Sequence, residues 1–157
     1  GGGVATACIT LGRLMGLRVW VTSRDATKRA KALELGAHEA FESGARLPHR
    51  VDAVMETVGA ATWDHSLKSL VPGGRLVVSG ATSGSEPPAD LSRVFFKQLS
   101  VVGSTMGTRA ELRRLVDLLD SCGRRPLIAQ TLPMTDAAQA LAAVAAGDVF
   151  GKIVLTR

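Results

Sequence analysis

The stretch GGGVATACITLGRLMGLRVWVTSRD, residues 1–25, decides the fold of this chain. Three glycines open a segment of small and apolar residues at helical spacing, Val4–Met15, and Gly16 ends it. The β-branched and aromatic run that follows, Arg18–Thr22, predicts a strand. A glycine turn, a helix and a strand in this order indicate the beginning of an alternating α/β fold.

The alternation continues to the end of the chain. Further strands are predicted at 39–41, 51–56, 75–79, 99–103, 127–132 and 152–156, and helices at 26–35, 62–70, 91–96, 109–119 and 136–146. Residues 71–74 and 80–89 are rich in Gly, Ser and Pro and are predicted to form a turn and a loop. Strands that alternate with helices imply right-handed βαβ crossovers. The sequence therefore predicts an α/β fold with a doubly wound, mostly parallel sheet.

The opening glycines match the phosphate-binding turn of a dinucleotide-binding (Rossmann) fold, whose pattern is G-x-G-x-x-G/A. If Gly2 is the middle glycine, Ala5 is the third small residue, and the first glycine and the first strand precede residue 1. The pyrophosphate in such a turn lies at a helix N-terminus, where free N–H groups and the helix dipole favour negative charge. Gly1, Gly2, Gly3 and Val4 are therefore candidate pyrophosphate-binding residues, and the sheet is expected to lack its first strand. Three glycines at a chain start can also be a remnant of cloning.

The residues that follow the strand Arg18–Thr22 bear on the choice of cofactor. A dinucleotide-binding fold places an acidic residue here, which binds the ribose hydroxyls of NAD. This chain has Ser23 and Arg24 instead, with Lys28 one helical turn later. A hydroxyl, an Arg and a Lys suit the dianionic 2′-phosphate of NADPH, which we expect to be preferred. The alternative makes Asp25 the ribose acid and favours NADH, but Asp25 is better explained as the cap of the helix at 26–35.

Five stretches in this order and spacing resemble one known family. They are GGGVA (1–5), ALELGA (32–37), DAVMETVG (52–59), LVPGGR (70–75) and FGKIVL (150–155). Together they resemble the cofactor-binding C-terminal half of the medium-chain dehydrogenase/reductases, the group of zinc-type alcohol dehydrogenases and quinone oxidoreductases. Each stretch alone is moderately specific, whereas their order and spacing are strongly specific and cover nearly the whole chain.

The resemblance implies three further groups of cofactor contacts, each at the end of a strand. Thr57, Val58 and Gly59 would line the crevice near the adenosine and the ribose. Gly80, Ala81 and Thr82 would approach the nicotinamide, and Gly103, Ser104 and Thr105 could bond its carboxamide. Ligands of parallel sheets bind at the carboxyl ends of the strands, and small residues there permit close backbone approach. Each triplet taken alone is equally compatible with an ordinary turn.

The resemblance also predicts how the chain divides. Residues 1–131 are expected to form the dinucleotide-binding domain, and residues 132–157 resemble the segment that returns to a catalytic domain absent from this chain. That other domain holds most of the substrate pocket and the zinc ligands in this family, so no catalytic residue is assigned here. An apolar face left open on residues 132–157 could favour a homodimer. The small-molecule substrate of the full-length protein is not specified by the fold.

Composition limits the remaining classes of function. The 157 residues are 46% hydrophobic and 21% charged, which is typical of one globular domain. The net charge of +5 is scattered, and the aromatic content is 4% with no Tyr, so we expect no nucleic-acid partner. Cys8 and Cys122 lie far apart without a nearby His, which predicts no metal site and two free thiols in a reducing cytoplasm. No apolar run is long enough to span a membrane.

These observations favour the cofactor-binding domain of an NADPH-dependent oxidoreductase. Its reaction would be hydride transfer to or from a carbonyl, alcohol, quinone or enone, with the cofactor carrying the chemistry. One alternative is a module that binds or senses NADPH without turnover. Another is an S-adenosylmethionine-dependent methyltransferase, which would want an acidic residue where Ser23 and Arg24 stand.

Overall fold

The computed structural model describes residues 2–147 and 149–157 of the chain. These residues form two compact units. The first unit joins residues 1–43 to residues 113–157, and the second unit spans residues 44–112. This division is not the boundary at residue 131 expected from the sequence, and the assignment of 132–157 to a further catalytic domain stays a prediction.

The first unit begins with two helices and two short strands. In chain order they are α1 (Gly3–Leu14), β1 (Trp20–Thr22), α2 (Ala26–Glu34) and β2 (Glu39–Phe41), and β1 pairs parallel to β2. A small core of Ile9, Ala32 and Ala37 joins the two helices to the strands. Gly12 on α1 lets this helix approach Val19 closely, because a β-carbon on Gly12 would lie 2.7 Å from Val19 Cγ2.

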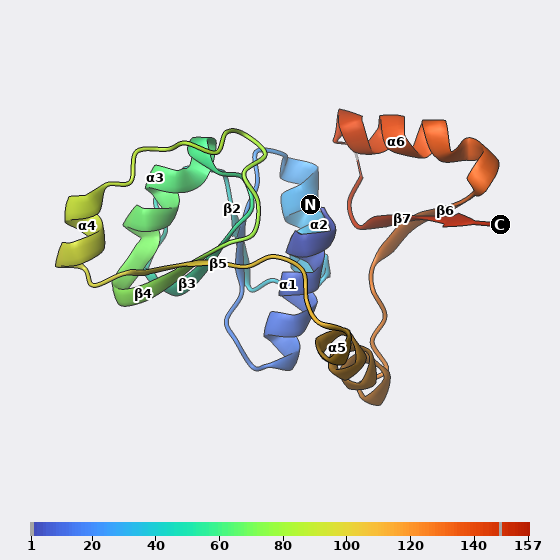
Figure 1. Cartoon of the computed structure of the whole chain (residues 1–157), viewed down its shortest axis with the longest axis horizontal. Coiled ribbons are helices and arrows are strands. Elements are labelled where there is room, and N and C mark those ends of the chain that lie inside the picture. Colours follow the sequence, from blue (N-terminus) through green and yellow to red (C-terminus); the bar gives the residue numbers. More distant parts are fainter. Residues whose placement is uncertain (1, 148) are drawn as a thin grey trace. The chain divides into compact units, whose positions relative to one another are not determined.

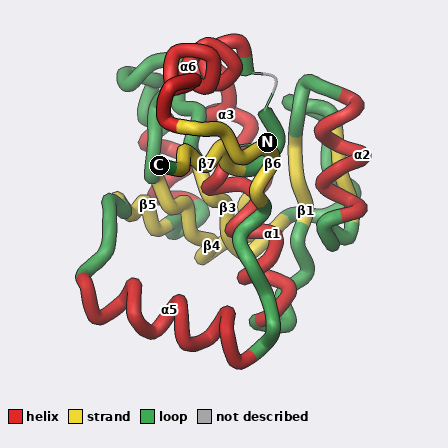
Figure 2. Tube along the Cα trace, turned by 90° about the vertical axis from the view of Figure 1, so that its right-hand side faces the viewer, coloured by secondary structure: helices red, strands yellow, loops and turns green. Residues whose placement is uncertain are grey.

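The C-terminal part of the first unit is one further βαβ crossover. It contains β6 (Ile128–Pro133), the 3₁₀ turn η1 (Met134–Asp136), α6 (Ala137–Ala146) and β7 (Lys152–Thr156). Strands β6 and β7 pair parallel, and both Figures 1 and 2 show α6 lying along one side of this pair. Helix α5 (Arg109–Ser121) begins in the second unit and ends in the first, and none of its residues is buried.

The second unit is a three-stranded parallel sheet with helices between its strands. Its elements are β3 (Val51–Glu56), α3 (Ala60–Ser69), β4 (Leu70–Val78), α4 (Leu91–Phe96) and β5 (Ser100–Gly103), with strand order β3-β4-β5. Figure 1 shows α3 and α4 beside these strands. The core consists of Leu67, Leu70, Leu76 and Leu99, which contact partly buried side chains from α3, α4 and β3. Burial of these leucines holds the two helices against one face of the sheet.

The predicted α/β alternation and the parallel pairing are confirmed. Every described strand pairs parallel, but the strands form three hydrogen-bonded sheets, not one continuous sheet. The predicted turn at 71–74 is wrong in one respect, because β4 includes it. Gly73 has a φ of +76° there, and the register with β3 shifts at the same place, so the extra residues make the beginning of β4 irregular.

No helix among the described residues is both long and apolar enough to cross a membrane.

Candidate functional site

The strand ends of the second unit bring the three predicted triplets to one edge of its sheet. Glu56, Val78 and Gly103 are aligned in register at the carboxyl ends of β3, β4 and β5. The triplets at 57–59, 80–82 and 103–105 lie at or beyond these ends, and Ser104 N donates to Val78 O at 2.8 Å. The carboxyl edge of a parallel sheet is where such folds bind ligands.

The first two of these loops are hydrogen-bonded to each other. Both the backbone N–H and the hydroxyl of Ser83 donate to Val58 O, each at 2.7 Å. Ala60 N donates to Gly84 O at 3.0 Å, and Ala61 N donates to Ser83 Oγ at 2.9 Å. The loops at 57–59 and 80–84 therefore form one rigid platform, which we call the loop platform.

Two glycines make this close approach possible. Gly59 has a φ of +88°, and a β-carbon on it would collide with Gly84 O and lie 3.0 Å from Ala81 Cα. A β-carbon on Gly80 would lie 2.9 Å from Thr57 O. Glycine is required at both positions because neighbouring backbone occupies the space that a side chain would need.

The buried carboxylate of Glu56 holds the loop platform in place through hydrogen bonds. Glu56 is 3% exposed. Its Oε1 accepts from Val58 N at 2.8 Å, from Gly59 N at 3.0 Å and from Thr62 Oγ1 at 2.8 Å. Its Oε2 accepts from Ser66 Oγ at 2.5 Å. Burial alone would raise the pKa of this carboxyl, but the four hydrogen bonds outweigh burial and hold the pKa below its ordinary value.

These contacts close the N-terminus of α3 to external anions. Gly59, Ala60 and Ala61 donate their N–H groups to Glu56, Gly84 and Ser83 respectively. The helix predicted at 62–70 begins two residues earlier, at Ala60, with Gly59 as its N-cap. The hydroxyl of Thr62 donates to Glu56. Sequence reasoning missed Glu56, although an acidic residue that ends a predicted strand just before a predicted helix was a readable signal.

Among the described residues of the first unit, no side chain caps the N-terminus of α1. Gly2 is the N-cap and has no side chain to accept from the helix. Gly3 and Val4 lie in the first helical turn, where N–H groups have no intrahelical acceptor. The helix dipole adds a partial positive charge at this end. Gly1, which the sequence also assigns to the pyrophosphate, lies outside the described residues.

Lys152 is a second residue that sequence reasoning missed. It opens β7, and its side chain lies over Gly3, so that a β-carbon on Gly3 would lie 2.8 Å from Lys152 Nζ. A side chain on Gly3 would therefore displace the ammonium group. The pairing of a glycine with a lysine across 149 positions could not be read from spacing, although Lys152 lies in the stretch FGKIVL that carries the family resemblance.

The predicted ribose-phosphate residues lie between β1 and α2. Arg24 is exposed. Ser23 O accepts from Arg29 Nη1 at 2.6 Å, and the Ser23 hydroxyl accepts from Asp25 N at 3.3 Å. Asp25 caps α2 as predicted, accepting from Lys28 N at 3.1 Å, and this bond is the first cause that lowers its pKa.

The ammonium of Lys28 has a partner that would compete with a phosphate. It donates to Gly147 O, at the C-terminal end of α6. Helix C-termini attract cations in this way. An ammonium group has three donors, so this bond leaves Lys28 able to contact a phosphate as well.

A protein zinc site needs several closely grouped Cys, His, Asp or Glu side chains. Among the residues that the structure describes, no three His, Cys, Asp or Glu side chains group closely enough to hold a metal ion. Cys8 and Cys122 are both free thiols, and burial raises the pKa of Cys8. The described donor set does not fit a zinc ion, and no chemistry of this chain is derived through one.

Comparison with known proteins identifies the group to which the chain is similar. The sequence model of the family described as "Zinc-binding dehydrogenase" matches residues 3–121. The chain is 31% identical to the zinc-type alcohol dehydrogenase-like protein YogA of Leptosphaeria maculans, over 99% of this chain and 48% of that protein. It is 28% identical to the quinone oxidoreductase of Mus musculus, over 98% of this chain and 52% of that protein.

A solved structure supports the same assignment. The crystal structure of an NAD-dependent alcohol dehydrogenase is 31% identical, with a TM-score of 0.89, and the match covers 99% of this chain and 48% of that chain. The chain thus spans about half the length of the relatives that it matches. On the family match across residues 3–121, the chain belongs to the zinc-binding dehydrogenase family.

Proposed function

We propose that this chain is the nicotinamide-dinucleotide-binding part of an oxidoreductase. The observation that carries the proposal is the open N-terminus of α1, with the ammonium of Lys152 over Gly3. Free N–H groups, a helix dipole and a lysine charge at one point are suited to a pyrophosphate. The solved relative described above is an NAD-dependent alcohol dehydrogenase, which supports the same class of cofactor.

Each group of residues has a part in holding the cofactor. Gly2, Gly3, Val4 and Lys152 would bind the pyrophosphate. The loop platform, with Thr57, Val58, Gly59, Gly80, Ala81 and Thr82, would line the crevice from the adenosine ribose to the nicotinamide. Gly103, Ser104 and Thr105 would bond the carboxamide. The platform supplies shape more than charge, because its donors are largely used within the protein.

We propose further that NADPH is preferred over NADH. Ser23 and the exposed Arg24 stand where NAD-binding folds place an acid, and Lys28 lies one turn along α2. The guanidinium of Arg24 suits a 2′-phosphate dianion. Asp25 is already engaged as the cap of α2, which favours Arg24 over Asp25 as the residue that meets the ribose.

The bound cofactor would supply a hydride, and the whole protein would transfer it to or from a carbonyl, alcohol, quinone or enone. The relatives named as alcohol dehydrogenase-like and quinone oxidoreductase proteins support this range of substrates. The residues of this chain would orient the nicotinamide and keep its reactive face at the edge of the sheet. The acid, base or metal that completes the reaction is not assigned to them.

Calorimetric titration of the chain with NADPH, NADH and S-adenosylmethionine tests the proposal. We expect NADPH to bind more tightly than NADH and S-adenosylmethionine not to bind. Equal or tighter binding of NADH would contradict the NADPH preference and return the ribose role to Asp25. Binding of S-adenosylmethionine alone would contradict the oxidoreductase assignment.

A further inference from the structure

A hollow in the second unit lies apart from the loop platform. Its volume is about 480 Å³, which is within the usual range for small-molecule sites. One wall is the loop at 44–50, which precedes β3, and the other is formed by His65, Lys68 and Ser69 on α3. None of these residues belongs to the proposed cofactor site.

The walls of the hollow carry basic side chains and no acidic ones. Five of the lining residues are basic: Arg46, His49, Arg50, His65 and Lys68. Lys68 is paired with Asp64 at 2.6 Å on the surface of α3, where both side chains are more than half exposed. Such an exposed pair is weak. Arg46 and Arg50 have no carboxylate partner among the described residues, so the hollow holds unneutralised positive charge.

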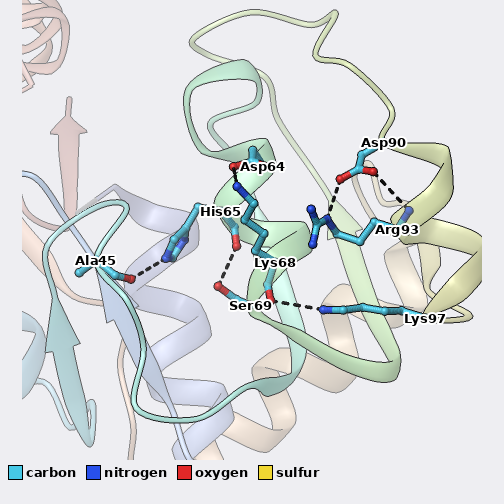
Figure 3. A network of polar contacts seen from close by, with 8 residues as sticks. All are labelled: Ala45, Asp64, His65, Lys68, Ser69, Asp90, Arg93 and Lys97. Atoms are coloured by element: carbon cyan, nitrogen blue, oxygen red, sulfur yellow. Dashed lines mark hydrogen bonds and ion pairs between the residues drawn. The ribbon is translucent and has the colours of Figure 1, made fainter.

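The charge of Arg50 acts on the neighbouring helix α4. Lys97, at the end of α4, donates to Leu70 O at 2.8 Å. It also donates to Lys68 O at 3.4 Å (Figure 3). Burial lowers the pKa of Lys97, and repulsion from Arg50 and then Arg93 lowers it further. Arg93 is paired with Asp90 at 2.6 Å, whereas Arg50 has no such pair. Among the described residues, no ion pair therefore offsets the positive charge of Arg50 near Lys97.

A hydrogen bond between His65 and Ala45 joins the two walls of the hollow. His65 Nε2 donates to Ala45 O at 2.8 Å, which ties the loop at 44–50 to the middle of α3 (Figure 3). The hydroxyl of Ser69 donates to His65 O at 2.7 Å. Because the loop is fixed at Ala45, the arginines at 46 and 50 are carried on a backbone anchored beside the hollow.

We propose that this hollow binds a small molecule that carries a phosphate group. The planar guanidinium groups of Arg46 and Arg50 can each donate two hydrogen bonds to phosphate oxygens, and Lys68 adds a further donor. The cations gather around one hollow and do not form the long stripe that a nucleic-acid backbone requires, which favours a small ligand. The site stands independently of the cofactor, because it shares no residue with the loop platform or with α1.

The test is a titration of the ¹⁵N-labelled chain with inorganic phosphate, followed through backbone amide shifts at constant ionic strength. We expect saturable shifts at residues 44–50 and 65–69. Arg46→Gln combined with Arg50→Gln should weaken the phosphate affinity by about tenfold or more, because two charge-assisted contacts are lost. The matched control, Arg113→Gln with Arg114→Gln on exposed positions of α5, should change the affinity by less than about twofold.

Three results would overturn the proposal. The first is an absence of saturable shifts at 44–50 and 65–69, including shifts found only near Gly3. The second is an unchanged phosphate affinity in the Arg46→Gln, Arg50→Gln variant. The third is tighter binding of a short thymidine oligonucleotide than of phosphate through the same residues, which would assign the hollow to a nucleic-acid backbone.

Discussion

The two parts of the proposed cofactor site differ in how their backbone N–H and C=O groups are hydrogen-bonded. In the second unit, the loop platform uses its own groups: Val58 O, Gly84 O and the Glu56 carboxylate accept nearly every nearby donor. In the first unit, the opening turn of α1 has Gly2 as a cap without a side chain, and the ammonium of Lys152 lies over Gly3. The backbone groups of the loop platform are largely hydrogen-bonded within the protein, whereas the first turn of α1 has N–H groups without an intrahelical acceptor.

This difference explains why glycine occurs in both places for different reasons. Gly59 and Gly80 are glycines because other backbone segments fill the space beside them. Gly2 has open space beside it, with no atom within 4 Å of where a β-carbon would lie. Substitution should therefore damage folding in the platform, whereas changes around the turn of α1 should damage ligand binding and leave folding intact.

The largest expected effect comes from Gly59→Ala. An alanine at a φ of +88° is strained, and its β-carbon would collide with Gly84 O, so the free energy of unfolding should fall by about 3 kcal/mol. Urea unfolding measures this change. The control is Gly73→Ala, where φ is +76° but nothing lies within 4 Å, and the expected loss is about 1 kcal/mol. Equal losses in the two variants would show that the platform is less tightly packed than described.

Removal of the buried carboxylate should have the next largest effect. Glu56→Ala leaves two backbone N–H groups and two hydroxyls without their acceptor, which should cost about 2–3 kcal/mol of stability. Glu56→Gln keeps an acceptor for the N–H groups, and Ser66 can rotate to accept from the new amide, so its cost should be about 1 kcal/mol. Thermal or urea unfolding separates the two. A Gln variant as unstable as the Ala variant would mean that the charge, and not the acceptor geometry, holds the platform.

The stability difference between wild type and Glu56→Gln should depend on pH. The pKa of Glu56 is lowered by folding, so its contribution is complete above the ordinary glutamate value of about 4.3 and is lost as the pH falls through the folded value. Urea unfolding of both proteins between pH 7 and pH 3 should show the two stabilities converging at the acid end. A constant difference over that range would contradict the role of the ionised carboxylate.

Smaller effects should distinguish Arg24, between β1 and α2, from Lys152, beside the first turn of α1. Arg24→Ala should weaken NADPH binding by about tenfold and leave NADH binding unchanged, because only NADPH carries the 2′-phosphate. Lys152→Ala should weaken both cofactors by a similar factor, because both carry the pyrophosphate. Calorimetry of the two variants with both cofactors gives the comparison. Equal losses of NADPH and NADH in Arg24→Ala would remove the basis for NADPH preference.

Much of the fold could be predicted from local pattern. Strands such as Val51–Glu56 and helices such as Leu91–Phe96 could be predicted because hydrophobic periodicity and the glycines between elements are signals within a few residues of sequence. The opening of β4 was not readable, since VPGG favours a turn locally, and β4 includes it because Leu70 and Arg75 on either side of it both pair with β3. Tertiary pairing overrode the local signal there.

The candidate site divides in the same way. The positions of the triplets followed from strand ends and from the family resemblance. The roles of Ser83 and Lys152 did not, because each acts on a residue that only the folded chain brings near: Val58 for Ser83, and Gly3 for Lys152. The partner of Lys28 at Gly147 is equally long-range and could not be inferred from spacing along α2.

A titration with NADPH tests whether one dinucleotide binds the residues of both parts of the proposed site. The ¹⁵N-labelled chain is titrated with NADPH, and the amide shifts of both parts of the proposed site are followed together. We expect the amides of Gly3, Val4 and Arg24 to shift with the same affinity as those of residues 57–59 and 80–82, because one dinucleotide would contact both parts. Shifts confined to one part, or different affinities for the two, would contradict the proposal that these residues bind a single nicotinamide dinucleotide.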